Sequence, residues 1–198
     1  MPPPRTTKTP TLDPDVGGVY TAEDRLARWL DLGTVTVFGS RWALEPEVVF
    51  ARVDDAQRYV DRVLTHLAAH GWRTHGAGGC PLAPVAVRPR RGALKAHYEQ
   101  HKHTIAIPPA ERGGGWALRE SVVLHELAHH LVAIGADPPG AHVEPPASPH
   151  DPPASPHGPP APHGPRFRRT LLAVFVEAGH PTAAALLGIA FADEGLAT

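Results

Sequence analysis

The chain contains a single cysteine, Cys80, among its 198 residues. An internal disulfide is therefore excluded, and so is a zinc site built from several cysteines. Long apolar runs are also missing. No stretch reaches the roughly 18 residues that a membrane span needs, and the Pro-rich start has no apolar signal-peptide region. We therefore expect a cytoplasmic protein that has no membrane partner.

Strong net charge is missing as well. The 19 Lys and Arg residues nearly balance the 20 Asp and Glu residues, which leaves a formal net charge of -1. Such a balance gives no general attraction to nucleic acid or to an anionic surface. A chain of this length suggests one domain, with enough residues to bury a core. Composition thus bounds the protein class, and the motifs have to indicate the function.

The most informative motif is HELAHH, residues 125–130. On a helix, His125 and His129 lie on one face and can bind the same ion, while Glu126 reaches a water molecule on that ion. The surrounding residues 121–134 are apolar nearly all round, which predicts a buried helix. Buried imidazoles and a buried carboxylate need a cation or a hydrogen-bond network to offset their desolvation. We therefore predict a Zn²⁺ site with Glu126 as the general base.

A catalytic zinc ion usually has three protein ligands, so a third must come from elsewhere. His163 is the first choice, because it directly precedes a predicted helix. That helix starts at Pro165 and presents an apolar face that includes Phe167, so the folded block can aim the imidazole. The alternatives left open are His180, His157 and Glu177.

The chain divides into four parts by composition. Residues 1–18 are rich in Pro, Thr and Gly and are expected to form a disordered tail. Residues 19–191 are expected to form a single domain, and residues 192–198 a short C-terminal tail. Residues 138–162 interrupt the domain with a Pro/His-rich repeat, EPPASPH, DPPASPH and GPPAPH. The repeat has no large apolar residues and cannot build a core, so a solvated insertion is expected.

Hydrophobic periodicity predicts helices and short strands, and hence an α+β fold. The predicted helices cover about 21–31, with a capping box at Thr21, then 54–70, 116–134, a helix from 165, and a last one to about 191. The predicted strands cover 34–38, 85–88 and 103–107. The last of these strands is the expected sheet edge beside the cleft, where an extended peptide could pair.

The residues around the motif resemble a known family. HELAHH on a core helix, followed later by HGPRF, is similar to the SprT-like minimal zincins and more closely to an actinobacterial family of zinc metallohydrolases. The resemblance extends over VYTAEDRLARWLD, FGSR, AQRYVDRVL, RRGALKAHYE and WALRESVVLHELAHH. It covers most of residues 19–137 and 163–178.

This resemblance implies a zincin-like minimal metalloprotease fold, with a small mixed or antiparallel sheet packed on helices that include the HExxH helix. It also implies that His125, His129 and His163 bind zinc and that Glu126 is the general base. Two features depart from the pattern. A long insertion precedes His163, and the cysteine-based zinc ribbon of many SprT-like proteases is missing, which weakens any inference of a DNA-repair role.

The expected function is a zinc-dependent metallohydrolase, most directly a metallopeptidase acting on a peptide or protein. Glu126 would take the proton of a zinc-activated water and pass it to the leaving amine. Tyr98, His97 and His103 are candidates for stabilising the oxyanion or for supporting a ligand from behind.

Two other functions stay open. One is a nuclease-like or other non-peptide hydrolase, in which a basic cluster would contact phosphates; no nucleic-acid fold signature accompanies that cluster. The cluster consists of Arg88, Arg90, Arg91 and Lys95. The other is a non-catalytic, zinc-stabilised binding protein. Glu126 discriminates between them, because a purely structural zinc site has no need of an unliganded carboxylate.

Overall fold

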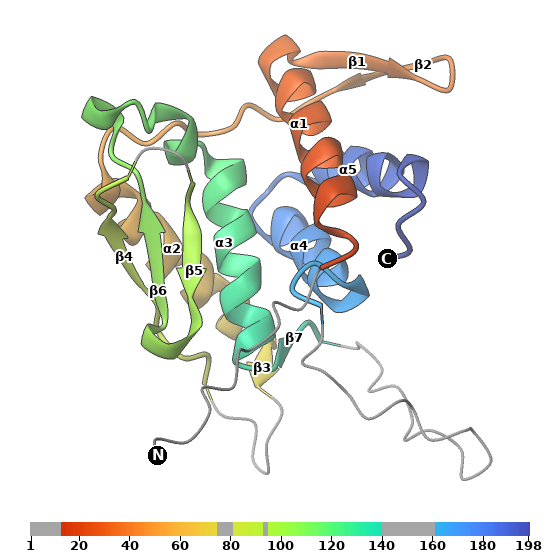
Figure 1. Ribbon diagram of the computed structural model, residues 1–198. Coiled ribbons are helices and arrows are strands. Elements are labelled where there is room, and N and C mark those ends of the chain that lie inside the picture. Colours follow the sequence, from red (N-terminus) through yellow and green to blue (C-terminus); the bar gives the residue numbers. More distant parts are fainter. Residues whose placement is uncertain (1–12, 75–80, 93–94, 140–160) are drawn as a thin grey trace, which may run out of the picture.

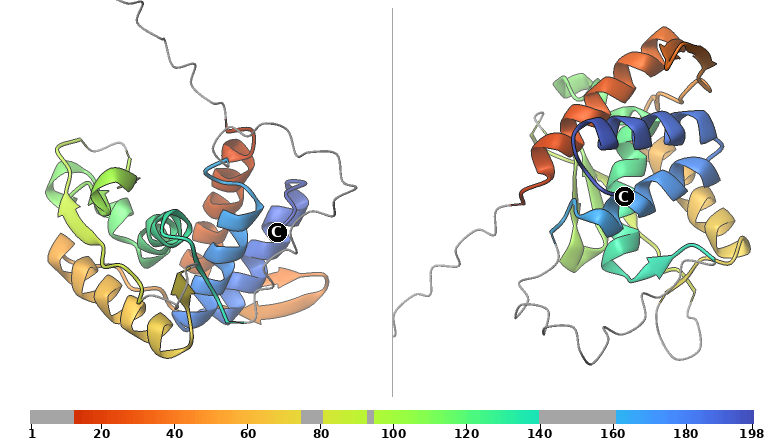
Figure 2. Two further views of the ribbon diagram at one scale, coloured as in Figure 1. Left: turned by 90° about the horizontal axis from the view of Figure 1, so that it is seen from below. Right: turned by 90° about the vertical axis from the view of Figure 1, so that its right-hand side faces the viewer.

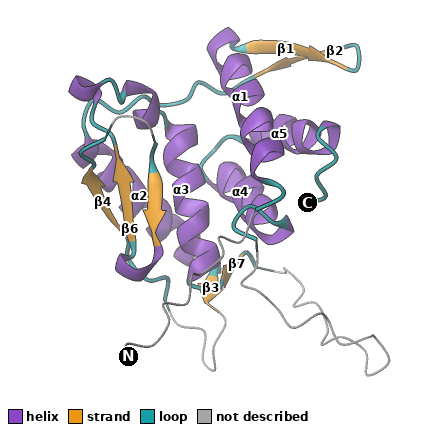
Figure 3. Cartoon of the chain, viewed as in Figure 1, coloured by secondary structure: helices purple, strands orange, loops and turns teal. Residues whose placement is uncertain are grey.

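The computed structural model of the chain describes residues 13–74, 81–92, 95–139 and 161–198. Over these residues the fold is α+β, with five α-helices and small antiparallel and mixed sheets (Figures 1 and 3). No helix within these ranges is both long and apolar enough to cross a membrane. Most of the Pro/His-rich repeat lies outside the described residues.

The helices are α1 (Val16–Leu32), α2 (Val53–Ala69), α3 (Glu120–Ala133), α4 (Pro165–Glu177) and α5 (Pro181–Asp193). The strands are β1 (Thr34–Val37), β2 (Ser40–Ala43), β3 (Arg73–Thr74), β4 (Ala86–Pro89), β5 (His97–Glu99), β6 (Thr104–Ile107) and β7 (Ala136–Asp137). Three short 3-10 helices are η1 (Gln100–Lys102), η2 (Ala110–Arg112) and η3 (Gly115–Leu118).

Helix α3 lies at the centre of the molecule. The three-stranded sheet and α2 lie on one side of it, and α1, α4 and α5 form a helical layer on the other (Figures 1 and 2). This position explains why α3 is apolar nearly all round: only a helix covered on both sides can bury residues over its whole circumference. The expectation of a buried motif helix is confirmed, because Leu124, Leu127 and Leu131 are fully buried.

The three-stranded sheet has the order β4-β6-β5, with β4 parallel and β5 antiparallel to β6. The prediction that residues 103–107 form the sheet edge is therefore wrong, because β6 is the central strand and all four of its residues are buried. A continuous apolar run such as TIAI is typical of a strand covered on both faces. The edge nearest α3 is β5, which the sequence pattern had not revealed.

Helix α1 also begins earlier than predicted. The capping box at Thr21 is wrong, because Thr21 lies inside the helix and its hydroxyl donates to the Gly17 carbonyl. The helix starts at Val16, within the segment expected to be a disordered tail. Residues 1–12 lie outside the described part of the chain. The other helices agree more closely: α2 is followed by Gly71 at φ 87°, and α4 starts at Pro165 as predicted.

The glycine triplet before α3 carries a packing constraint. The motif helix was expected from residue 116, but η3 intervenes and α3 starts at Glu120. The backbone of Gly114 approaches Pro108 so closely that an added Cβ would lie 2.4 Å from the Pro108 carbonyl oxygen. The neighbouring Gly115 faces open space. Only the first of these two positions therefore requires glycine for steric reasons.

Gly114→Ala should lower the free energy of unfolding by about 1–3 kcal/mol, because the new methyl group forces the lead-in to α3 away from Pro108. Gly115→Ala makes the same chemical change one residue later and should leave stability within about 0.5 kcal/mol of wild type. Urea denaturation measures both. Equal midpoints for the two variants would show that the close approach at Gly114 is not a constraint on the fold.

Candidate metal centre

Helix α3 places three motif side chains together in the interior. His125 and Glu126 are buried, and His129 is half-buried. Because His125 and His129 are four residues apart, their rings lie on one face, and their Nε2 atoms are 3.1 Å apart. Two imidazole nitrogens that face each other at this distance either share a proton or point at a common cation. The predicted pairing of these histidines on one helical face is confirmed.

His163 completes a group of three imidazoles. It precedes α4, and one ring nitrogen from each of His125, His129 and His163 lies within 4.8 Å of the others. The Nε2 atom of His163 is buried and has no hydrogen-bond partner. A buried polar atom without a partner is costly unless something else satisfies it. The three side chains therefore form a buried three-histidine group that could hold a metal ion.

Two carboxylates fix the orientation of these rings. The Nδ1–H of His125 donates to Glu23 of α1 at 2.6 Å, and the Nδ1–H of His163 donates to Asp13, also at 2.6 Å. Metal-binding histidines commonly donate their second ring nitrogen to a carboxylate in this way, which fixes the tautomer and leaves Nε2 free for the ion. Two residues near the N-terminus, Asp13 and Glu23, thus hold the rings of His163 and His125 in place.

A buried arginine anchors the third histidine. Arg168 of α4 is 2% exposed, and its Nη1 donates to the His163 carbonyl at 2.8 Å and to the Asp15 carboxylate at 2.7 Å. Its Nε donates to the carbonyl of Ala197 at 2.8 Å. One guanidinium therefore ties together the N-terminal segment, the residue that precedes α4 and the C-terminal end of the described chain.

Phe167 supplies the apolar wall of the group. Its ring stacks on His129, with centroids 4.3 Å apart, and lies 5.0 Å from the rings of His125 and His163. Phe167 is almost fully buried. The ring keeps water away from this side of the imidazoles, which strengthens every electrostatic interaction among them. The prediction that Phe167 faces the core and positions His163 agrees with this arrangement.

Burial and the two carboxylates set the charge of the group. Burial lowers the pKa of His125, but the Glu23 carboxylate outweighs it and raises that pKa to about 9. Burial, together with the charge on His125, lowers the pKa of His129 to about 2. Burial also lowers the pKa of His163. The group therefore carries one proton in excess at neutral pH, on His125, and a metal ion has to displace it.

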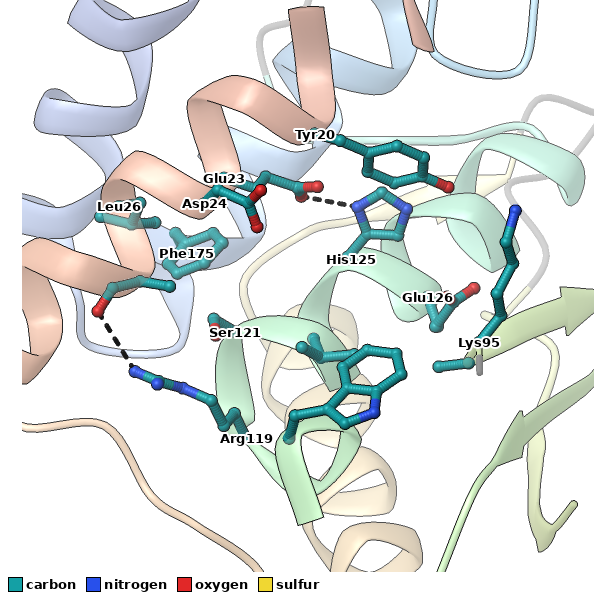
Figure 4. A pocket seen from close by; sticks show the side chains of 14 residues that line it. Tyr20, Glu23, Asp24, Leu26, Lys95, Arg119, Ser121, His125, Glu126 and Phe175 are labelled. Carbon is teal, nitrogen blue, oxygen red and sulfur yellow. Dashed lines mark hydrogen bonds and ion pairs between the residues drawn. The ribbon is translucent and has the colours of Figure 1, made fainter. Parts of the chain in front are cut away.

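Glu126 lies beside the three-histidine group without joining it. Burial raises its pKa to about 7, against the lowering effects of His125 and of the nearby Tyr98 backbone N–H. Glu126 and His125 border a cleft of about 500 Å³ between α1 and α3 (Figure 4). Trp116, Leu26 and Phe175 contribute apolar surface to the same cleft. A buried carboxyl group with a pKa near 7 is suited to exchange protons at neutral pH.

Tyr20 of α1 covers the centre from the solvent side. Its ring stacks over His125 at 6.0 Å between centroids and meets His163 edge-on at 5.4 Å. Burial raises the pKa of Tyr20, and the charge of Glu126 raises it further. The hydroxyl therefore keeps its proton and can donate. In Figure 4 the Tyr20 side chain lies over His125 on the side of the cleft where Glu126 and Lys95 also point.

The side chains of the other candidates, Tyr98, His97 and His103, contact residues outside the three-histidine group. The Tyr98 hydroxyl donates to Nδ1 of His130 at 3.0 Å, and the Nε2–H of His130 donates to the Ala83 carbonyl. The side chain of His97 lies 3.3 Å from Glu99, and the ring of His103 meets His130 edge-on. A supporting role for Tyr98, His97 or His103 stays a prediction.

The alternatives for the third ligand also have other partners. His180 Nε2 is 3.0 Å from the Glu120 carboxylate, and Glu177 is paired with His66. His157 lies outside the described residues. Among the described candidates, His163 alone joins the two motif histidines.

Sequence reasoning missed Asp13, Tyr20 and Glu23. Asp13 follows a Pro-rich stretch that looks like a solvated tail, and acidic residues on a surface helix are too common to stand out. A signal was present all the same. Tyr20 and Glu23 are three residues apart and therefore share one face of α1. Both also fall within the segment VYTAEDRLARWLD, which carried part of the family resemblance.

His129→Ala should remove one tightly bound zinc equivalent, because two remaining imidazoles do not hold a catalytic-type ion. At zinc concentrations about 100-fold above the dissociation constant, the variant should also lack about 2.7 kcal/mol of zinc-dependent stabilisation. Elemental analysis after dialysis measures the first effect, and thermal unfolding the second. His101→Ala, an exposed histidine on η1, serves as the control. The same zinc content in His129→Ala and wild type would rule out the centre.

Zinc binding should release a proton from His125 at pH 8, where Glu126 is already ionised and His125, with its pKa near 9, is still protonated. Affinity should therefore rise about tenfold per pH unit up to about pH 9 and then level off. Glu23→Gln removes the charge that raises the His125 pKa, so it should reduce this proton release. Calorimetry in two buffers of different ionisation enthalpy measures the proton. Equal release by both proteins would contradict the role of Glu23.

Comparison with known proteins adds no family assignment: no family model, no curated protein and no solved structure matches this chain. The relationship to SprT-like minimal zincins expected from HELAHH is therefore not supported by a match. What the structure supports is the buried group of His125, His129 and His163, which could hold a metal ion.

Proposed function

We propose that the chain is a zinc-dependent hydrolase of the minimal zincin type and that its substrate is a peptide or protein. The proposal rests on one arrangement of side chains. Three imidazoles converge in the interior, the free Nε2 of His163 is buried without a partner, and an unliganded buried carboxyl group, Glu126, stands beside them at a cleft. A purely structural metal site would not need that carboxyl group.

The donor set favours zinc over other common ions. Three neutral imidazole nitrogens, with no carboxylate among the nearest donors, suit zinc, copper or nickel rather than magnesium or calcium. Zinc accepts nitrogen ligands in a tetrahedral arrangement and leaves a fourth position for water or substrate in catalytic sites. His125, His129 and His163 would hold the ion, and Glu23 and Asp13 would keep their rings in place.

A zinc ion held there would act as a Lewis acid, which would lower the pKa of water at the site and favour the ionised form of Glu126. Glu126 can then accept a proton from the attacking water and deliver it to the leaving amine. The Tyr20 hydroxyl, which keeps its proton, can donate to the oxygen on which negative charge develops. Lys95 lines the same cleft and adds positive charge at its mouth.

The edge strand β5 suggests how a peptide would be held. One edge of β5 pairs with β6, and the strand lies near Glu126, because the Tyr98 backbone N–H affects the pKa of that carboxyl group. No further strand pairs with β5 among the described residues. An extended peptide could therefore add to β5 next to the cleft, so that backbone hydrogen bonds align it and apolar side chains enter the cleft.

The nuclease-like alternative is less well supported by the geometry. Arg88 pairs with the Glu99 carboxylate, and Arg90 donates to the backbone carbonyl of Lys95. Arginines engaged in this way are less available to contact phosphates. Of the basic cluster, Lys95 is the member that lines the cleft. A single lysine gives little selectivity for a polyanionic substrate.

Glu126→Gln should keep both the fold and the bound zinc and lower the rate of peptide hydrolysis by about two to four orders of magnitude, because it removes the proton acceptor without removing a ligand. The assay uses zinc-loaded protein with unfolded casein or a peptide library. Glu111→Gln makes the same change at an exposed site and should keep full activity.

Zinc content and thermal unfolding are measured on the same samples, which separates chemistry from folding. If wild type and Glu126→Gln hydrolyse substrate at the same rate while both hold zinc, Glu126 is not the general base. If zinc-loaded wild type hydrolyses none of the substrates, the protein is better described as a zinc-stabilised binding protein.

A further inference from the structure

A second group of metal-ligand side chains lies at the other end of α4. His66 and His70 are one turn apart at the C-terminal end of α2, and Glu177 is the last residue of α4. One ligand atom from each lies within 4.8 Å of the others. His66 Nε2 is 2.9 Å from a Glu177 carboxylate oxygen, and the two imidazole rings stack with centroids 3.9 Å apart.

The tautomer of His70 already suits a ligand. Its Nδ1–H donates to the His66 carbonyl at 2.8 Å, so in the neutral ring Nε2 carries the free lone pair. A backbone carbonyl that accepts the second ring N–H is a usual support for a metal-binding histidine. The cluster therefore combines three donors in reach of one another with a ring held in the metal-binding tautomer.

We propose that His66, His70 and Glu177 form a second binding site for a divalent transition metal of the zinc class. Two imidazoles and one carboxylate are a donor set that zinc uses, with water able to complete the coordination. The site is open to solvent, because the His66 side chain is 42% exposed and that of Glu177 25%. An ion there clamps the C-terminal end of α2 to that of α4 (Figure 2).

The two centres are separate. His163 precedes α4 and Glu177 ends it, and the helix between them rises about 20 Å at about 1.5 Å per residue. No single ion or shared water can connect groups at that distance. The second site therefore stabilises the packing of α2 against α4 rather than taking part in chemistry at Glu126. It does not rest on the proposed hydrolase function.

An ion pair between protonated His66 and Glu177 is the competing explanation for the contact. Such a pair contributes little to stability at an exposed site, and it does not involve His70. A metal site, in contrast, needs all three residues. Loss of His70 therefore separates the two explanations, because it removes a ligand and leaves the ion pair intact.

The test is equilibrium dialysis of the full chain against buffered free zinc, followed by elemental analysis. Wild type should bind one equivalent more than His70→Ala and than Glu177→Gln, whereas His101→Ala should bind as wild type does. Zinc at about 100-fold above the dissociation constant of this site should raise the unfolding temperature of wild type by about 5–10 °C more than that of His70→Ala.

Equal zinc content in wild type and His70→Ala would overturn the proposal and leave an ion pair only. The same dialysis on His129→Ala reports the first centre, so failure of one site is visible without failure of the other. Hydrolysis by zinc-loaded His70→Ala, measured in parallel, should equal that of wild type.

Discussion

Burying three imidazoles around one point is the constraint on which the rest of this structure depends. The Nδ1 atoms of His125 and His163 are already committed to carboxylates, so their Nε2 atoms are turned inward, where His129 also points. Phe167 closes one side and excludes water. Without a cation, such a cluster keeps an excess proton and a polar atom that has no partner, and both are costly in the interior. A bound metal ion resolves both costs together.

The N-terminal segment belongs to this centre. Asp13 and Glu23 hold two of the rings, Tyr20 covers them, and Asp15 meets the buried guanidinium of Arg168. Since Arg168 also holds the His163 carbonyl, the segment and the third histidine are fixed by one another. Helix α3 supplies two of the three imidazoles, but residues far from it in the sequence decide how the rings of His125 and His163 are oriented. Metal binding and docking of α1 should therefore be coupled.

The sequence predicted the part of the site that is encoded locally. The spacing of HELAHH placed His125, Glu126 and His129 on a buried helix, and the apolar face of the helix after Pro165 singled out His163. It did not predict the supporting carboxylates, since Asp13 and Glu23 become special only when α1 folds across α3. The prediction that residues 103–107 form the sheet edge was wrong for the same reason. Periodicity recognised β6 as apolar, but only tertiary pairing decides that β5 is the edge.

In the zinc-loaded protein, His125, His129 and His163 should hold the metal ion and leave Glu126 free. Anomalous diffraction at the zinc edge, from crystals of the zinc-loaded protein, tests it most directly. We expect a peak about 2.0–2.1 Å from the Nε2 atoms of all three histidines, with Glu126 near the ion but outside its ligand set. A centre that keeps the three rings in this arrangement and shows no peak, or a peak in which Glu126 replaces His163 as a ligand, would contradict it.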